Sequence, residues 1–357
     1  MKKKKVLVAM SGGVDSSVAA ALLKNDGYDV IGATMQVWPR EAPDSERSCC
    51  SLSAVEDARK VTRKLNIPHY VLNFRNIFEE KVIGDFVSEY HSGRTPNPCI
   101  RCNEHIKFDA LIKKADGLGI EMIATGHYAR IEQRGSKFSL LKGIDPQKDQ
   151  SYMLYVMNQA SLGRTLFPNG DKTKKEIRKI ARSFDLPVAE KAESQEICFV
   201  PEDNYGSFIE EFTNNETKPG PILDSRGNVL GTHKGIIHYT IGQRKGLGIP
   251  RPEPLYVIKI DPERNAIIVG GKNETLGTAL EANGVHFISG KVPDGELEVT
   301  AKIRYNSKES KATVCPFNDS WARVRFSKPQ NAITPGQSVV FYNGETVIGG
   351  GIINSKL

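Results

Sequence analysis

The sequence predicts an α/β protein with a doubly wound parallel sheet, followed by a small linking domain and a C-terminal antiparallel β-barrel. Over residues 1–130, short apolar runs alternate with amphipathic stretches of helical spacing, which is the pattern of a parallel sheet covered by helices. Beyond residue 219 the chain changes to short alternating runs separated by turn sequences, which is typical of antiparallel β modules. We therefore expect three domains, over residues 1–200, 201–275 and 276–357.

The elements of the first domain follow from the apolar pattern. The run 6–10 predicts a buried strand, and the alanine- and leucine-rich run 14–24 predicts a helix. Further strands are expected over 28–35, 68–73 and 121–124, and further helices from residue 53, over 77–90 and over 106–115. Two prolines and an asparagine in 93–103 are expected to exclude a helix there.

The remaining elements are a helix and many short strands. Residues 203–212 predict a helix. After it, turn sequences at 224–228, 261–265 and 343–344 separate alternating runs at 255–260, 266–269, 339–342 and 346–348. Cys315 lies in this part of the chain and is expected to be a core residue of a β module.

The composition of the 357 residues is that of a globular protein, with 39% hydrophobic and 25% charged residues. No apolar run is long enough to span a bilayer, and the run after the N-terminal lysines is too short for a signal peptide. We expect a cytoplasmic protein without a membrane partner. The net charge is +7, from 49 Lys and Arg against 42 Asp and Glu, which permits a nucleic-acid partner.

A strongly basic helix is predicted behind the capping box of Thr173 and Glu176. Its basic residues are Lys172, Lys174, Lys175, Arg178, Lys179 and Arg182. The alternatives for this face are simple solvation and contact with nucleic-acid phosphates.

The stretch 11–17, Ser-Gly-Gly-Val-Asp-Ser-Ser, follows the first strand and opens the first helix. Glycines let backbone N–H groups approach an anion, and the helix N-terminus adds partial positive charge. The chain lacks the Gly-Lys-Ser/Thr of a Walker A loop and the Gly-x-Gly-x-x-Gly dinucleotide turn at this place. The stretch resembles the PP-loop of N-type ATP pyrophosphatases, which transfer AMP to a substrate oxygen.

That resemblance implies an ATP site, at which Asp15 holds Mg²⁺ against the phosphates. Met35 and Gly126 fall at the ends of other predicted strands and are expected to converge on the same nucleotide. The residues expected to bind ATP are Ala9, Met10, Ser11, Gly12, Gly13, Val14, Asp15, Ser16, Met35 and Gly126.

The six cysteines are Cys49, Cys50, Cys99, Cys102, Cys198 and Cys315. In a cytosolic chain of this size they are expected to be reactive, metal-binding or buried rather than a disulfide framework. A following helix and the charges of Arg101 and Lys107 are expected to lower the pKa of the Cys102 thiol.

Together with the PP-loop, several strings closely resemble the tRNA-specific 2-thiouridylases over essentially the whole chain. They are Pro-Asn-Pro at 96–98 with Cys-Asn at 102–103, Thr-Gly-His-Tyr at 125–128, Lys-Asp-Gln at 148–150, Ser-Gln-Glu-Ile-Cys-Phe at 194–199, the string at 238–248 and Pro-Gly-Gln at 335–337.

The resemblance implies that ATP adenylates the C2 oxygen of the wobble uridine (U34) of tRNA, with Asp15, Cys102 and Cys198 as catalytic residues. A persulfide on Cys198 then delivers sulfur. Cys102 either attacks that persulfide to release hydrosulfide or closes a disulfide with Cys198 as the sulfur leaves. The implied partners are tRNAs with Lys, Glu and Gln acceptors, and a cysteine desulfurase or a persulfide relay protein.

The same resemblance implies an RNA-binding surface that includes a target-base site. The target base would lie against Asn97, Pro98 and Cys99. The residues implied in tRNA binding are His127, Lys148, Asp149, Gln150, Arg304, Tyr305 and Gln337. A flipped-out anticodon base is expected.

The chain departs from the best-known bacterial pattern, which has Asp at the place of Cys99. Cys99, Cys102 and Cys198 therefore supply three thiolates, a set that suits a [4Fe–4S] cluster carrying hydrosulfide, or a zinc ion. The cluster route is the alternative to the persulfide route. Cys49 and Cys50 have no assigned role.

Two other functional classes compete with an RNA sulfurtransferase. Amide- and amine-forming PP-loop ligases, such as argininosuccinate or NAD synthetases, do not need the pair Cys102 and Cys198, so thiol-independent turnover would favour them. A non-catalytic RNA-binding protein with a structural metal would keep its function after Asp15→Ala.

Overall fold

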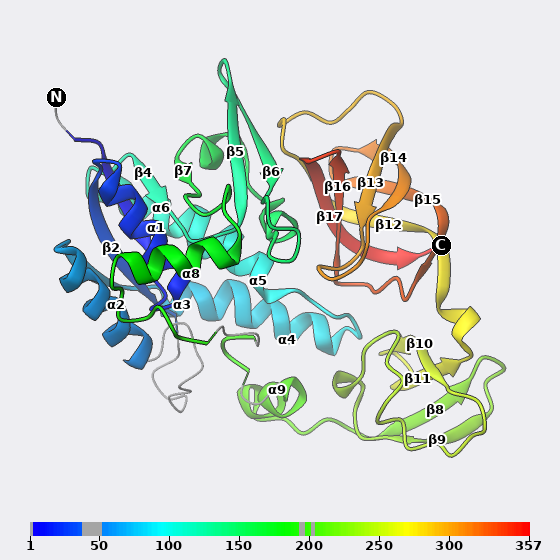
Figure 1. Cartoon of the computed structure of the whole chain (residues 1–357). Helices are drawn as coiled ribbons and strands as arrows, with labels where there is room; N and C mark the ends of the chain where they lie inside the picture. The colour runs from blue at the N-terminus through cyan, green and yellow to red at the C-terminus, as the bar shows by residue number, and fades with distance from the viewer. Residues whose placement is uncertain (1–2, 38–51, 193–196, 201–203) are drawn as a thin grey trace.

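A five-stranded parallel sheet, in the order β3-β2-β1-β4-β7, organises the N-terminal part of the molecule (Figure 1). The structure is a computed structural model that describes residues 3–37, 52–192, 197–200 and 204–357. The strands are β1 (Lys5–Ala9), β2 (Asp29–Gln36), β3 (His69–Asn73), β4 (Met122–Ala124) and β7 (Thr165–Leu166). All adjacent strands are parallel, and strand order reverses beside β1. A reversal of this kind opens a ligand crevice at the strands' carboxyl ends.

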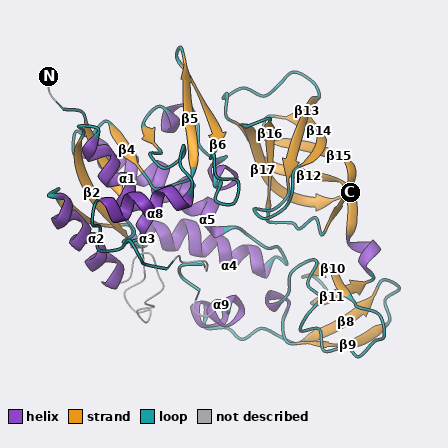
Figure 2. Ribbon diagram, viewed as in Figure 1, coloured by secondary structure: helices purple, strands orange, loops and turns teal. Residues whose placement is uncertain are grey.

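Helices cover both faces of this sheet (Figure 2). Alternate residues of a strand point to opposite faces, and β1 shows it: Val6 and Val8 belong to one hydrophobic cluster, Leu7 and Ala9 to another. The first cluster includes residues of α1 (Val14–Asn25), α2 (Leu52–Leu65) and α8 (Lys174–Ser183). The second includes residues of α6 (Leu111–Gly117). The predicted doubly wound arrangement is confirmed.

Two long helical stretches lie between β3 and β4 in the chain. The first comprises α3 (Arg75–Phe78), the π-helical η1 (Glu79–Ile83) and α4 (Gly84–His91). The second comprises α5 (Pro98–Arg101), the π-helical η2 (Cys102–Ala110) and α6. The expectation that 93–103 excludes a helix is wrong for its last six residues. Pro98 occupies the first helical turn behind the N-cap Asn97, where a missing N–H costs nothing and the fixed φ favours the helix.

A hairpin that the sequence did not predict joins the first domain to the C-terminal one. It consists of β5 (Ala129–Arg134) and β6 (Lys137–Lys142). Leu141 of β6 pairs with Thr346 of β17 (Thr346–Lys356), so the hairpin extends the C-terminal sheet. In Figure 1 it stands between the parallel sheet and the barrel.

The middle of the chain forms a small mixed sheet after α9 (Tyr205–Thr213). Its strands are β8 (Gly220–Asp224), β9 (Val229–His233), β10 (Tyr256–Asp261) and β11 (Ala266–Gly270). They lie in the order β10-β11-β8-β9, with β11 and β8 parallel.

The C-terminal part is a closed antiparallel barrel of six strands. These are β12 (Leu276–Phe287), β13 (Leu297–Lys302), β14 (Ser310–Asn318), β15 (Trp321–Asn331), β16 (Ser338–Asn343) and β17. Pairing of β12 with both β15 and β17 closes the barrel, as predicted. Cys315 is not a core residue, because it lies half-exposed on β14 with its Sγ donating to Glu296 Oε1 at 3.2 Å. The predicted domain boundaries at 200 and 275 stay predictions.

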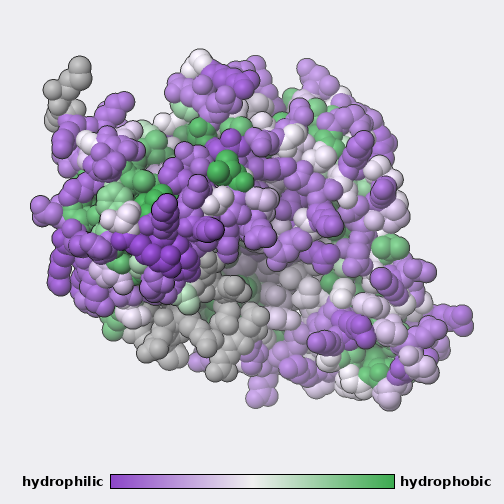
Figure 3. Space-filling view, in the orientation of Figure 1, coloured by the Kyte–Doolittle hydropathy of each residue, from purple (hydrophilic) through white to green (hydrophobic). Residues whose placement is uncertain are grey.

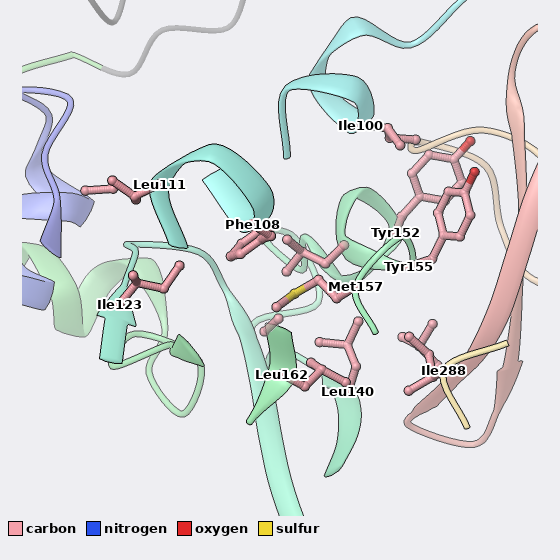
Figure 4. Close-up of a cluster of buried hydrophobic side chains, with 14 of the residues drawn as sticks. Ile100, Phe108, Leu111, Ile123, Leu140, Tyr152, Tyr155, Met157, Leu162 and Ile288 are labelled. Carbon is pink, nitrogen blue, oxygen red and sulfur yellow. The ribbon is translucent and has the colours of Figure 1, made fainter. Parts of the chain in front are cut away.

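One hydrophobic cluster runs from the parallel sheet to the barrel (Figure 4). Leu111 and Ile123 lie at its sheet end, and Ile288 lies at its barrel end. Between them pack residues of the short helices η3 (Ser151–Leu154) and α7 (Gln159–Leu162). The other short helices are η5 (Ile236–His238) and η6 (Lys272–Thr275).

The surface is predominantly hydrophilic in the view of Figure 3. The most hydrophilic atoms of that view gather over α8, whose exposed residues include Lys175 and Lys179. Within the described ranges, no helix has both the length and the apolar character that crossing a membrane requires.

Candidate active site

Hydrogen bonds between serine hydroxyls and backbone groups stabilise the loop between β1 and α1. Ser11 N–H donates to Ser16 Oγ at 3.2 Å, and the hydroxyls of Ser16 and Ser17 donate to Gly13 O at 3.2 and 2.8 Å. Gly12 has φ +67° and approaches α2 so closely that a β-carbon there would overlap the carbonyl oxygen of Ala54. Only glycine fits this position. The loop is thus a preformed turn at the N-terminus of a 12-residue helix, which suits an anion.

Asp15 faces two partners from distant parts of the chain. Lys174 Nζ lies 2.7 Å from Oδ1 and 2.9 Å from Oδ2 of Asp15, and the Tyr128 hydroxyl donates to Oδ1 at 2.7 Å. Lys174 is fixed at the first turn of α8, because Thr173 caps that helix and Lys174 N–H donates to Asp145 Oδ2 at 2.9 Å. The carboxylate that was predicted to hold Mg²⁺ therefore already carries a cationic partner in this structure.

Gly126 meets the start of α1 directly. A β-carbon at Gly126 would lie 2.7 Å from the backbone N of Ser16 and the carbonyl carbon of Asp15. The buried Asn169 bridges the contact, since its Nδ2 donates to Asp15 O at 2.9 Å and to Gly126 O at 3.1 Å. Met35 lies near the end of β2, the neighbour of β1 on the other side. The three strand ends lie at one edge of the parallel sheet; their convergence on one nucleotide stays a prediction.

Lys191 is a further cation beside this loop. Its Nζ lies 3.2 Å from Gly12 O and 2.7 Å from Asp57 Oδ2. Burial alone would raise the pKa of Asp57, but hydrogen bonds from Lys191 and Lys60 outweigh it and hold that pKa below its ordinary value. Asn169 and Lys191 were not predicted from the sequence, Lys174 was predicted only as part of a basic face, and Tyr128 had no predicted role. The only signal for Tyr128 was its place in the Thr-Gly-His-Tyr string.

Cys102 and Cys198 pack against the same hydrophobic cluster, although they lie 96 positions apart in the chain. Both are half-buried, and the cluster beside them centres on Phe199, whose ring lies 5.6 Å from Phe78 and 5.3 Å from Phe86. Cys99, in contrast, is exposed at the start of α5. Cys102 lies inside the helix rather than before it, so the expected influence of a following helix on its thiol does not apply as predicted.

The three-cysteine metal site that was the alternative prediction is not formed in this structure. Across residues 3–37, 52–192, 197–200 and 204–357, no three His, Cys, Asp or Glu side chains gather into a group that could hold a metal ion. The donor set of Cys99, Cys102 and Cys198 therefore does not fit a [4Fe–4S] cluster or zinc here. The predicted residues Cys49 and Cys50 lie outside the described residues.

The predicted target-base residue Asn97 and the predicted tRNA-binding residue Tyr305 both contact the short helix η3. Asn97 Nδ2 donates to Met153 Sδ at 3.5 Å. The Tyr305 ring lies 6.1 Å from the ring of Tyr152. Burial raises the pKa of Tyr305, and electrostatic interaction with Asp149 and Cys99 adds to this. Arg304 is partly exposed beside it, with Nη2 donating to Asn331 O at 3.1 Å.

Other predicted tRNA-binding residues form hydrogen bonds within the protein. Asp149 accepts hydrogen bonds from Gly143 N–H at 3.0 Å and Ser151 N–H at 3.1 Å, while Gln150 Oε1 accepts from Tyr128 N–H at 3.0 Å. Lys148 is half-buried in the same loop. Gln337 Nε2 donates to Thr95 O at 2.9 Å, which ties the barrel to the segment before Asn97.

His127 is buried rather than facing solvent. Its ring packs between Phe108 and Phe167, with centroids 6.0 and 5.9 Å away. Lys107 Nζ lies 3.3 Å from Nε2, and Thr125 Oγ1 lies 2.6 Å from Nδ1. Burial, with the charge of Lys107, lowers the pKa of His127 well below its usual value. Contact of this ring with tRNA would require the surrounding side chains to move.

Three protein families match successive parts of the chain. The family described as "tRNA methyl transferase HUP domain" matches residues 4–202, "tRNA methyl transferase PRC-barrel domain" matches 206–271, and "Aminomethyltransferase beta-barrel domain" matches 278–353.

Two full-length relatives and one solved structure illustrate the similarity. The tRNA-specific 2-thiouridylase MnmA of Acetivibrio thermocellus is 54% identical over 99% of this chain and 100% of the relative, and that of Clostridium botulinum is 53% identical over 99% of each. A solved U34-tRNA thiolase NcsA from Methanococcus maripaludis with its [4Fe-4S] cluster is only 15% identical, with a TM-score of 0.36 over 60% of this chain and 66% of that chain. This last likeness is too low to carry a conclusion.

Proposed function

The chain belongs to the tRNA-specific 2-thiouridylases, and from that premise we propose which of its residues activate the uridine and which transfer the sulfur. The protein is an ATP-dependent tRNA sulfurtransferase that forms 2-thiouridine. The proposed substrate position is the wobble uridine, in tRNAs with Lys, Glu and Gln acceptors. The observation that carries the proposal is the pairing of two sites on one sheet edge: a phosphate loop with its own cations, and two cysteines on one cluster.

Activation of the uridine is assigned to the loop of Ser11–Ser16. The uridine C2 oxygen attacks the α-phosphorus of ATP, and pyrophosphate leaves with the bonding electrons. Asp15 would hold Mg²⁺, because its carboxylate offers the oxygen ligands that this ion prefers. When bound, Mg²⁺ would neutralise part of the phosphate charge. The ammonium of Lys174, which is paired with Asp15 in this structure, would then turn to a phosphate oxygen of ATP.

Tyr128 links the two substrates in this scheme. Its hydroxyl holds Asp15, and its backbone N–H is held by Gln150 in the loop implied in tRNA binding. The position of the phosphate-site carboxylate is therefore mechanically connected to the loop next to Tyr152 and Tyr305. Tyr305 offers a ring for stacking against an unpaired base, and Arg304 a guanidinium for phosphate.

Sulfur transfer is assigned to Cys198 and Cys102. A cysteine desulfurase or relay protein loads Cys198 as a persulfide. In one route the terminal sulfur attacks C2, AMP leaves, and Cys102 attacks Cys198 Sγ to release the thiouridine. In the other, Cys102 attacks Cys198 Sγ first and releases hydrosulfide, which attacks C2. Both routes end with a disulfide between Cys102 and Cys198, which accounts for the two electrons that the released sulfur takes.

The test is nucleoside analysis of an unmodified glutamate tRNA transcript after incubation with protein, ATP, Mg²⁺ and a sulfur supply. We expect 2-thiouridine with the unaltered protein and none with Cys198→Ala. Cys315→Ala is the matched control, because Cys315 lies on the barrel surface. Thiouridine formation that survives Cys198→Ala would overturn the assignment of the sulfur carrier, whereas splitting of ATP to AMP without thiouridine would overturn the choice of acceptor.

A further inference from the structure

Cys99 and Cys102 lie three residues apart in the first turns of one helix, with Cys102 packed on the cluster that also receives Cys198. We propose that Cys99 is a resolving thiol, which takes over the disulfide that Cys102 and Cys198 share after each sulfur transfer. This inference rests on the sulfur-transfer reaction proposed above. It adds the step that returns Cys198 to its starting state.

The backbone brings the two thiols of Cys99 and Cys102 close. The N–H of Cys102 is shared between Cys99 O and Pro98 O, and Ile100 N–H donates to Asn97 O at 3.2 Å. Such i to i+3 hydrogen bonds tighten the turn toward a 3₁₀ form, in which side chains three apart eclipse each other. Ordinary helical spacing holds their β-carbons at about 5–6 Å. A disulfide needs about 3.5–4.5 Å, so the two β-carbons must approach each other by about 1–2 Å when the bond forms.

Of the three thiols, that of Cys99 is the most exposed to solvent. Cys102 and Cys198 are half-buried against the aromatic cluster around Phe199, so a reductant reaches a disulfide between them poorly. Cys99 is exposed one turn away. Exchange onto Cys99 and Cys102 therefore moves the oxidised pair from the cluster to the surface, where an external thiol can attack it.

The chemistry balances without an additional cofactor. The Cys99 thiolate attacks Cys102 Sγ, the bond from Cys99 to Cys102 forms, and the bond from Cys102 to Cys198 breaks. Cys198 leaves as a thiolate with the electron pair, so the step itself involves no net oxidation. An external dithiol then supplies two electrons and two protons to Cys99 and Cys102 and is itself oxidised to a disulfide. Cys198 is meanwhile ready to accept the next sulfur.

The test uses the full chain and two variants, Cys99→Ala and Cys99→Ser, of which the second keeps nearly the size of the thiol beside the target base. Product is followed over many turnovers with a cysteine desulfurase, cysteine and a limiting dithiol as sulfur supply and reductant. Samples are quenched with an alkylating agent, and disulfide-linked peptides are identified by mass spectrometry. Cys315→Ala serves as the control for removal of a half-exposed thiol.

We expect each Cys99 variant to form about one thiouridine per protein molecule and then to slow about tenfold or more relative to the first turnover. The linked peptides of Cys102 and Cys198 should accumulate in these variants, whereas those of Cys99 and Cys102 should appear in the unaltered protein. Later turnovers as fast as the first, with no accumulated linkage, would overturn the proposal. So would loss of bound iron together with Cys99, because the three cysteines would then act as cluster ligands.

Failure of this inference differs from failure of the sulfurtransferase assignment. If the first turnover occurs and depends on Cys198, the assignment stands whatever Cys99 does. If neither the unaltered protein nor any variant forms thiouridine, the assignment itself fails. Melting curves of both variants that match the unaltered protein establish that the effects are chemical.

Discussion

The ammonium of Lys174 lies 2.7 Å from Oδ1 of Asp15, across 159 positions of sequence. An isolated Asp15 carboxylate would repel the phosphates of ATP, and the paired lysine balances its charge. In the proposed scheme, ATP binding replaces this ion pair by contacts of Lys174 with phosphate and of Asp15 with Mg²⁺. Neither the Asp15 carboxylate nor the Lys174 ammonium is then left without a charged partner.

Replacement of Lys174 by Gln should slow tRNA-dependent release of AMP by about 10²-fold, the usual effect of losing one charge-stabilising donor. Lys175→Gln is the matched control, since Lys175 is exposed on the next position of α8. The measurement is AMP formation under saturating tRNA across a range of ATP concentrations. Equal effects of the two variants would mean that Lys174 acts only through general surface charge.

Gly12→Ala and Gly119→Ala should separate a steric from a conformational effect. The two glycines have nearly equal φ, +67° and +65°, but only Gly12 has neighbours that a β-carbon would meet. A left-handed alanine costs about 1–2 kcal/mol by itself. Thermal unfolding should therefore show a modest loss for Gly119→Ala, and a larger loss with abolished ATP binding for Gly12→Ala. Comparable melting temperatures and intact ATP binding in both variants would contradict the close contact with Ala54.

Much of the first domain was predictable because its strands are short apolar runs and its helices have clear spacing. The start of α5 was missed because two prolines were treated as helix breakers. Pro98 instead sits in the first turn, where proline is favourable. The hairpin β5–β6 was missed although its two-residue turn, Gly135-Ser136, is a local hairpin signal. Only its attachment to Thr346, more than 200 positions away, has no local signal.

Stability should fall as the pH drops below about 6.5, partly because His127 is buried as a neutral ring. Its folded pKa lies below the unfolded value, so both states are neutral above pH 6.5, and only the unfolded chain gains a proton as the pH falls below that value. One such group contributes a slope of up to about 1.4 kcal/mol per pH unit.

His127→Gln removes that titration and should flatten the slope of unfolding free energy between pH 7.5 and 5, as measured by urea denaturation. The remaining slope comes from His69, His233 and His238, whose pKa values are also lowered by burial. An unchanged slope in His127→Gln would contradict the neutral buried ring.

Arg304→Ala should weaken tRNA binding and reduce the slope of log affinity against log salt by about one, as expected for loss of one phosphate contact. Arg59→Ala is the control, because Arg59 lies on α2 in an ion pair with Glu56 at 2.6 Å. The measurement is the tRNA affinity of both variants between low and moderate salt. If both variants lose affinity alike, Arg304 has no specific contact.

The candidate site was only half visible in the sequence. Ser11, Gly12 and Asp15 were recognisable because adjacent residues make the loop. Asn169, Lys174 and Lys191 reach it from later segments, and no local pattern marks a residue whose partner is 150 positions earlier. His127 was expected from its string to contact tRNA; its ring packs between Phe108 and Phe167, and its role in tRNA binding stays a prediction.

The most direct test of the central claim follows a labelled sulfur atom through a single turnover. Protein loaded with ³⁴S persulfide and cleared of free sulfide is mixed with ATP, Mg²⁺ and unmodified tRNA, while bound iron is measured on the same sample. We predict that 2-thiouridine carries the label, in an amount that matches the persulfide on Cys198, with no stoichiometric iron. Unlabelled product, or product that appears only with bound iron and added sulfide, would contradict the account.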